Sequence, residues 1–151
     1  MTTTSQELQV ALSNVPNFLG CFPSDKLPVP TTNDYSFIIN YDPSEKKGSH
    51  WVAIKCQHKN MCYFDSMGMG PDDDDRILGD KTHILQWMLR EKKDRRIIIN
   101  RIQYQSLFAN TCGEWSALFI KSPKLLTRAH MSNNPDKFVQ EWFQNTLRSQ
   151  T

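Results

Sequence analysis

The chain has 151 residues and a mass of 17.6 kDa, which predicts one compact domain spanning residues 1–151. Hydrophobic residues make up 38% of it and charged residues 23%, a composition that excludes an intrinsically disordered protein. The formal net charge is +2, from 18 Lys and Arg against 16 Asp and Glu. This excess is too small to predict nucleic acid or a membrane as the main partner, so any basic site must be local.

The sequence also makes predictions about compartment and metal content. It contains no apolar run of about 18 residues, and its first residues lack the basic start and apolar centre of a signal peptide. The cysteines are too few and too irregularly spaced for a disulfide framework or a zinc site. We therefore expect a soluble intracellular protein in a reducing compartment, with no membrane partner and no metal. The four cysteines are Cys21, Cys56, Cys62 and Cys112.

The first predicted element is a short amphipathic helix that ends by Pro16. It begins at Thr4-Ser5-Gln6-Glu7, which fits a capping box. Residues 17–33 carry three prolines among turn-forming residues, and they predict an ordered loop. The apolar residues of the helix recur at helical spacing: Leu8, Ala11, Leu12 and Val15.

The next predicted elements are strands. Residues 35–40 are typical of a buried strand, and the polar residues 42–48 predict a turn after it. Residues 50–56 and 61–65 flank a short polar connection, the pattern of an antiparallel hairpin.

The second half of the chain predicts three helices and one strand. We expect a helix at residues 82–92 after a turn rich in Gly, Pro and Asp at 68–75, a strand at 96–104, a buried helix at 112–121 and a last helix capped by Asn134-Pro135. Because helices and strands do not alternate strictly, the sequence predicts an α+β fold with a central mixed sheet. The expected inner faces are Ile84, Leu85, Met88 and Leu89 in one helix, and Phe138, Val139, Trp142, Phe143 and Leu147 in the last.

The hairpin brings a candidate catalytic base to a carboxylate. A two-residue turn pairs Gln57 with Asn60 and, counting outward, His50 with Met67, which makes Asp65 a diagonal neighbour of His50. A three-residue turn would instead place Asp65 on the other face of the sheet. A carboxylate at one imidazole nitrogen fixes the tautomer and leaves the other nitrogen to act as a base.

Cys112 is the candidate nucleophile. It lies where a polar loop turns into the predicted helix at 112–121, and a helix N-terminus favours a thiolate. Gly113 leaves room for a substrate carbonyl, and Gln105 offers a side-chain donor for an oxyanion hole, with Gln103 as a competitor for that role. From these residues alone, Cys112 could equally be a core residue, His50 a strand-end histidine bonded to a backbone carbonyl, and Asp65 a turn former.

The order of these residues resembles a known protease group. Residues 48–53 read Gly-Ser-His-Trp-Val-Ala, residues 62–68 read Cys-Tyr-Phe-Asp-Ser-Met-Gly, and Gln105 and Cys112-Gly113 follow. This pattern resembles the adenovirus maturation protease (adenain) and the ubiquitin-like-protein-specific cysteine proteases, over residues 18–120. In papain-like enzymes the cysteine precedes the histidine, so the chain order separates the two groups.

The resemblance implies a cysteine endopeptidase and a role for each residue. His50 would be the general base, Asp65 the acid that orients it, Gln105 the oxyanion donor and Cys112 the nucleophile. Cleavage would follow small, Gly-Gly-like residues, because Trp51 beside the histidine would narrow the cleft. The adenovirus enzymes use glutamate where this chain has aspartate, and aspartate is common in the wider group.

The resemblance also suggests partners. It implies a viral or virus-like-element protease that cleaves structural precursor proteins, located in the virion or the host nucleus. No cofactor is required by the sequence; an activating peptide tethered by a disulfide is disfavoured by Asp94 and Arg95, whereas DNA stays open as an activator. Alternatives are a deconjugase for ubiquitin-like modifiers, an acyltransferase of the same fold and an inactive interaction module. The local basic cluster that would contact DNA is Arg90, Lys92, Lys93, Arg95 and Arg96.

Overall fold

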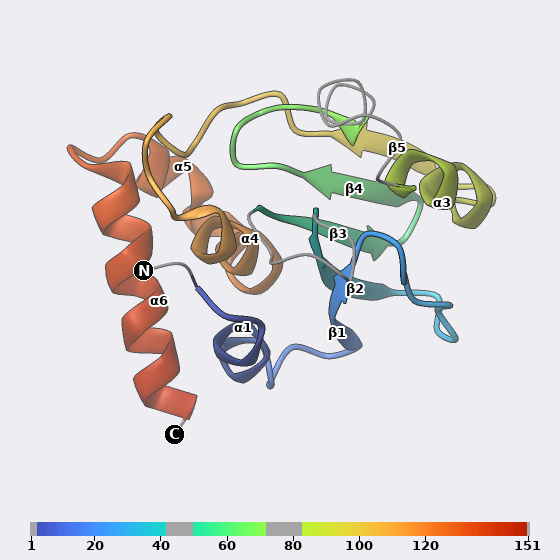
Figure 1. Ribbon diagram of the computed structural model, residues 1–151, viewed down its shortest axis with the longest axis horizontal. Helices are drawn as coiled ribbons and strands as arrows, with labels where there is room; N and C mark the ends of the chain where they lie inside the picture. Colours follow the sequence, from blue (N-terminus) through green and yellow to red (C-terminus); the bar gives the residue numbers. More distant parts are fainter. Residues whose placement is uncertain (1–2, 42–49, 72–82, 151) are drawn as a thin grey trace.

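A computed structural model describes residues 3–41, 50–71 and 83–150 and contains a five-stranded mixed sheet with helices on both faces (Figure 1). The strands follow one another across the sheet in chain order. The three central strands are antiparallel, and each edge strand pairs parallel to its neighbour. The predicted α+β fold with a central mixed sheet is confirmed. The strands are β1 (Phe18–Pro23), β2 (Tyr35–Asn40), β3 (Trp51–Gln57), β4 (Asn60–Phe64) and β5 (Arg96–Ile99).

The helices form two layers around the sheet (Figure 1). One face is covered by α1, α4 and α6, which share a core with residues such as Ile38, Ala53 and Phe64 of the strands. The opposite face packs against α3 through a second core that includes Phe37 and Ile54. In the described part of the chain, no helix is long and apolar enough to cross a membrane. The helices are α1 (Ser5–Ala11), α3 (Ile84–Glu91), α4 (Cys112–Lys121), the 3-10 helix η1 (Pro123–Leu125), α5 (Leu126–His130) and α6 (Pro135–Gln150).

Helix α1 begins with the predicted capping box. The backbone N–H of Glu7 donates to the Thr4 hydroxyl at 3.1 Å, and the Glu7 carboxylate accepts from the Thr4 N–H at 3.0 Å. These bonds satisfy donors that have no partner within the first turn. The helix ends at Ala11, one turn before Pro16.

The β3–β4 hairpin has the predicted two-residue turn. Gln57 pairs with Asn60, and the register continues to Ala53 opposite Phe64. His58 occupies the turn with a φ of 56°, a left-handed conformation of the kind that tight hairpin turns require. Because this register fixes which side chains share a face, the hairpin decides where the histidine and the carboxylate meet.

The prediction of a loop over residues 17–33 is wrong, because β1 lies within it. This strand pairs parallel to β2, with an irregularity in register between Phe18 and Cys21. Gly20 lies in this irregularity with a φ of 125°, a conformation that glycine adopts without strain. Pro23 is tolerated because β1 is an edge strand, where one backbone N–H needs no partner in the sheet.

Two further predictions are corrected by the structure. In α3, Leu89 is 55% exposed, whereas Trp87 is 3% exposed and donates its indole N–H to the Pro28 carbonyl at 2.9 Å. Strand β5 ends at Ile99 because Asn100 turns the chain: its side chain both donates to and accepts from the backbone of Ile102. The predicted turn at 42–48, the second half of the turn predicted at 68–75, and the start of the helix predicted at 82–92 lie outside the described residues.

The C-terminal half matches the prediction except in one connection. Helix α4 has the predicted bounds, and α6 begins at Pro135 and buries Val139 and Phe143 on the expected face. The short η1 and α5 between them were not predicted, since each holds few residues and only Ala129 of α5 is buried. Helix α4 lies between the sheet and α6 (Figure 1), so the nucleophile predicted at its start is supported from both sides.

Candidate active site

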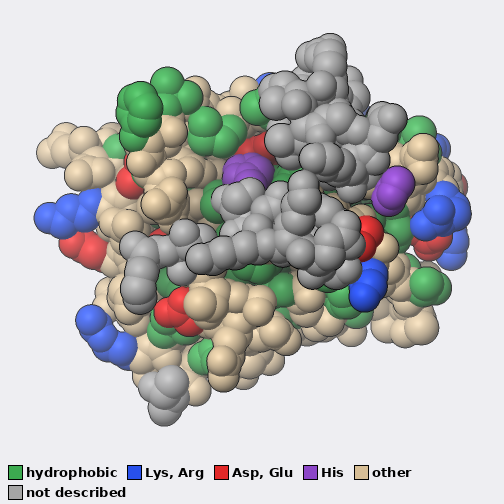
Figure 2. All heavy atoms as spheres, viewed as in Figure 1, with side chains coloured by type: hydrophobic (Ala, Val, Ile, Leu, Met, Phe, Trp, Pro, Cys, Tyr) green, Lys and Arg blue, Asp and Glu red, His purple; other side chains and the backbone are tan. Residues whose placement is uncertain are grey.

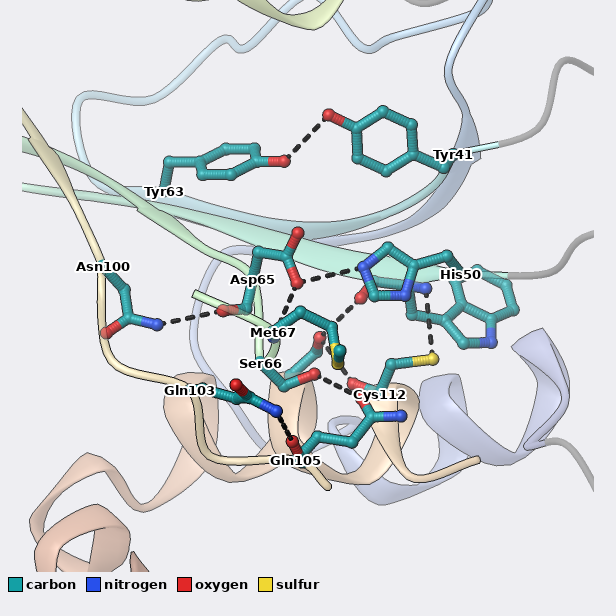
Figure 3. A network of polar contacts seen from close by, with 12 residues as sticks. Tyr41, His50, Tyr63, Asp65, Ser66, Met67, Asn100, Gln103, Gln105 and Cys112 are labelled. Atoms are coloured by element: carbon teal, nitrogen blue, oxygen red, sulfur yellow. Dashed lines mark hydrogen bonds and ion pairs between the residues drawn. The ribbon is translucent and has the colours of Figure 1, made fainter. Parts of the chain in front are cut away.

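His50 and Asp65 meet as the hairpin register predicts. His50 Nε2 lies 3.0 Å from Asp65 Oδ1, and the two side chains point toward each other in Figure 3. The Asp65 side chain is fully buried, whereas the His50 side chain is 24% exposed. The Tyr41 ring lies beside the imidazole, with ring centroids 5.9 Å apart. This arrangement commits one ring nitrogen to the carboxylate and leaves Nδ1 to exchange a proton with another group.

The surroundings of His50 favour its charged form. Burial disfavours the imidazolium, but hydrogen bonds to Asp65 and Cys112, together with their negative charges, outweigh burial and raise the pKa of His50 from 6.5 to about 10. The same contacts join all three side chains into one cluster. His50 is therefore an imidazolium at neutral pH, ready to donate a proton.

The backbone after β4 holds Asp65 in place. Its Oδ1 also accepts from the Met67 N–H at 2.8 Å, and its carbonyl accepts from the Asn100 side chain at 2.9 Å. Gly68 donates to the same carbonyl at 2.8 Å with a φ of 77°, and a Cβ there would lie 2.9 Å from the Arg101 carbonyl oxygen. Only glycine fits this tight approach. Among the described residues, Asp65 Oδ2 is buried with no hydrogen-bond partner.

Cys112 is the first residue of helix α4, as predicted, and contacts the first residue of strand β3. The backbone N–H of Trp51 donates to its sulfur at 3.4 Å, so the thiol is bonded to the residue that follows His50. The Ser116 hydroxyl donates to the Cys112 carbonyl at 2.8 Å and stiffens the first turn. The free N–H groups and the dipole of a helix N-terminus both stabilise a thiolate and a developing oxyanion.

Gly113 has a different role from the one that the sequence suggested. A Cβ at this position would lie 3.1 Å from Thr3 Cβ and 3.2 Å from Trp51 Cδ1. The missing side chain thus allows α4 to pack closely against β3 and the N-terminal segment, rather than opening space for substrate.

The predicted oxyanion donor, Gln105, is 5% exposed and held by its neighbours. Its amide oxygen accepts from the Ser66 hydroxyl at 2.7 Å, and its amide nitrogen donates to the Ala109 carbonyl at 2.5 Å. The nitrogen end points toward Cys112 in Figure 3. Since an amide nitrogen carries two protons, one is left for a substrate. The competitor Gln103 instead donates to the Gln105 carbonyl at 3.0 Å and braces the backbone.

Asp136, at the start of α6, holds the loop that precedes the nucleophile. Its carboxylate accepts from the Thr111 hydroxyl at 2.6 Å, the Trp115 indole at 3.2 Å and the Ser106 N–H at 3.2 Å. Burial raises the pKa of Asp136, but these hydrogen bonds outweigh burial and hold the pKa below its usual range. The last helix is therefore fixed to both ends of the segment that carries Gln105 and Cys112.

The N-terminal segment covers the other side of the nucleophile. The Thr3 carbonyl accepts from the Trp51 indole at 3.1 Å, and the Thr3 hydroxyl donates to the carboxylate of Glu114. Burial raises the pKa of Glu114. Trp51 is consequently 7% exposed and packs against Thr3, as well as flanking His50.

The other cysteines, and Arg95 of the basic cluster, have ordinary structural surroundings. Burial raises the pKa of Cys21 to about 12 and also raises that of Cys56 and Cys62. Arg95, expected to contact DNA, has a side chain only 12% exposed that donates to the His58 carbonyl at 3.0 Å, so it serves the fold. Within the described ranges, no group of three or more His, Cys, Asp and Glu could hold a metal ion.

Sequence reasoning missed three contributors to the site. Ser66 follows Asp65 directly, and its position next to a predicted acid was the available signal. The Trp51 N–H has no sequence signal, since a backbone donor is present at every residue except proline. Asp136 lies in the first turn of α6, and only the packing of α6 on α4 shows what it binds.

Comparisons with known proteins identify the fold. No family model and no curated protein matches the chain by sequence. The central domain of uncharacterized Lpg1148 from Legionella pneumophila matches with a TM-score of 0.61 and 10% identity, covering 99% of this chain and 97% of that one. The ASFV pS273R protease matches with a TM-score of 0.58 and 17% identity, covering 94% of this chain and 66% of that one. The SUMO protease Ulp1, with its catalytic cysteine oxidized, matches with a TM-score of 0.54 and 16% identity, covering 97% of this chain and 75% of that one. The chain shares the fold of these three proteins, two of which are proteases.

Proposed function

We propose that this chain is a cysteine peptidase with Cys112 as its nucleophile. One observation carries the proposal: His50 lies 3.0 Å from buried Asp65, and the backbone N–H of the next residue, Trp51, donates to the Cys112 sulfur at the N-terminus of α4. A nucleophile, a base and a group that orients the base are the parts that acyl transfer requires. The fold shared with the ASFV protease and Ulp1 agrees with this chemistry.

The proposed reaction uses each side chain in turn. The Cys112 thiolate attacks the scissile carbonyl carbon, and the oxyanion accepts hydrogen bonds from the Cys112 N–H and the remaining Gln105 N–H. The C–N bond breaks as the His50 imidazolium protonates the leaving amine, which leaves a thioester. A water molecule then attacks the thioester while His50 takes a proton from that water, and Cys112 leaves as the thiolate.

We further propose that the substrates are structural precursor proteins of a virus or virus-like element, cut after Gly-Gly-like residues. The support is the resemblance of the motif to the maturation proteases and the fold shared with the ASFV protease. A second candidate, removal of ubiquitin-like modifiers, is supported by the fold shared with a SUMO protease. Linear Gly-Gly peptides and a folded SUMO conjugate, tested side by side, distinguish the two.

Cysteine alkylation tests the proposed nucleophile without any substrate. Iodoacetamide at pH 7 is expected to label Cys112 first, because Cys112 lies at a helix N-terminus next to the residue that follows His50, whereas burial raises the pKa of Cys21, Cys56 and Cys62. Mass spectrometry of digested protein at successive times gives the rate at each cysteine. His50→Ala is the comparison and should slow labelling of Cys112 alone. Equal rates at all four cysteines would contradict the assignment.

A mixed peptide library then tests the activity itself. Cuts made by the untreated protein and lost after alkylation would support a cysteine peptidase and give its consensus. Running the library with and without DNA tests the proposed activator. If Cys112 is labelled selectively but neither peptides nor a SUMO conjugate are cut, the peptidase proposal fails and an acyltransferase or interaction module replaces it.

Gln105→Glu is expected to lower kcat by on the order of 10²–10³-fold with little change in KM. The substitution keeps the shape and the bond from Ser66, but it removes the amide donors and places a negative charge where the oxyanion forms. Initial rates on a library-derived peptide measure the effect. Gln103→Glu is the control and should lose less than about tenfold, because Gln103 donates only to the Gln105 backbone. A larger loss in the Gln103 variant would show that Gln103, and not Gln105, is the oxyanion donor.

A further inference from the structure

The loop between the oxyanion donor and the nucleophile presents two large apolar side chains to solvent. Leu107 is 68% exposed and Phe108 is 97% exposed. Figure 2 shows hydrophobic side chains gathered at its upper left, where Figure 1 places the connection between β5 and α4. An adjacent pair of exposed apolar side chains beside a catalytic centre is a candidate contact surface.

This loop is held firmly although its tip is exposed. Ser106 donates its N–H to Asp136 at 3.2 Å and accepts from the Ala109 N–H at 3.2 Å. The Ala109 carbonyl in turn accepts from the Gln105 amide. Both ends of the loop are therefore fixed, and the side chains at its tip are held away from the core. A preorganised apolar surface loses little conformational entropy when it binds a ligand.

We propose that Leu107 and Phe108 form a specificity subsite that contacts an apolar side chain of the polypeptide substrate close to the scissile bond. The proposal rests on the proposed peptidase function and deepens it. A chain bound at both Cys112 and the Gln105 amide has its cleaved bond at the two ends of the segment that carries Leu107 and Phe108. Burial of an aliphatic or aromatic side chain against Phe108 then adds binding energy that a serine at the same substrate position would not supply.

A segment of substrate fits this surface better than a second copy of the chain does. A stable protein interface buries about 800 Å² on each partner. One aromatic side chain buries about 150–250 Å², so Leu107 and Phe108 together fall well short of that area. They suffice for one or two side chains of a bound peptide.

Quenched peptides and a matched pair of surface variants test the subsite. The peptides share a Gly-Gly core and differ by Leu or Phe in place of Ser at one flanking position at a time. The test variant is Leu107→Ser with Phe108→Ser. The control is Val29→Ser with Leu89→Ser, which removes two apolar side chains that are 83% and 55% exposed and lie outside the loop.

The wild type is expected to cleave the best apolar peptide about 10- to 100-fold faster in kcat/KM than its serine counterpart. The loop variant should lose this preference while its rate on the serine peptide and its unfolding midpoint stay unchanged, and the control should keep the preference. A preference that survives in the loop variant, or a wild type that cleaves all peptides equally, overturns the subsite while the peptidase stands. A wild type that cleaves no peptide overturns the subsite, and if it also leaves a folded SUMO conjugate uncut, the proposed function is overturned with it.

Discussion

Replacing either Cys112 or His50 by alanine is expected to lower kcat/KM for peptide cleavage by on the order of 10⁴- to 10⁶-fold. Without the thiol no thioester forms, and without the imidazole no group accepts the thiol proton or donates a proton to the leaving amine. Because the two residues act as a unit, the double variant should lose no more than the more damaging single variant. Single-turnover rates on a library-derived peptide, measured for the three variants and the wild type, test this.

The controls separate lost chemistry from lost structure. Cys62→Ala removes a thiol and His58→Ala removes an imidazole, both from the β3–β4 hairpin, where Cys62 is half-buried and His58 is exposed. Both variants should retain activity within about tenfold. Unfolding midpoints in urea should show all variants folded under assay conditions. Activity of Cys112→Ala within tenfold of the wild type would remove Cys112 from the mechanism.

Asp65→Asn is expected to lower kcat by about 10²–10⁴-fold and to move the alkaline limb of its pH profile to lower pH. The Asp65 hydrogen bond and charge help raise the pKa of His50 to about 10 against the opposing effect of burial. Without that charge the imidazolium loses its proton at a lower pH, and the leaving amine is then no longer protonated. Profiles of kcat against pH from 6 to 11 measure the limb. An unchanged alkaline limb would show that Asp65 does not set the charge of His50.

The raised pKa of His50 also predicts that the stability of the fold depends on pH. The folded-state pKa of His50 lies above its unfolded value of 6.5, so the charged ring stabilises the fold fully below pH 6.5. This contribution declines as pH rises through about 10. The free energy of unfolding of the wild type should therefore fall over that interval, and it should fall less in Asp65→Asn.

Local patterns in the sequence were enough to predict the elements that carry the candidate site. Given a two-residue turn, the contact between His50 and Asp65 follows from counting residues in the hairpin; the sequence left a three-residue turn open, and the structure has the two-residue turn. Helix α4 was predicted with the bounds that it has, because a polar loop gives way abruptly to an apolar run at Cys112. Each of these predictions depends on residues close together in the sequence.

Features that depend on distant partners were missed. Strand β1 pairs parallel to β2 across a connection rich in proline, and its own residues do not alternate as those of a half-buried strand do. In α3 helical spacing predicted Leu89 inside, but the position of the Pro28 carbonyl favours Trp87 there. The packing reason for Gly113 needed both Thr3 and Trp51, from two other parts of the chain.

The bonds from Asp136 also make α6 a determinant of how often the site is assembled. When α6 leaves α4, Ser106, Thr111 and Trp115 lose their shared acceptor together, and the segment that carries Gln105 and Cys112 loses this anchor at both of its ends. The fraction of molecules able to turn over substrate at any moment then equals the fraction with α6 docked. Each loss of about 1.4 kcal/mol in docking raises the ratio of undocked to docked molecules tenfold. Substitutions on the inner face of α6, remote from the thiol, would therefore lower the concentration of active enzyme while the chemistry of each docked molecule stays the same.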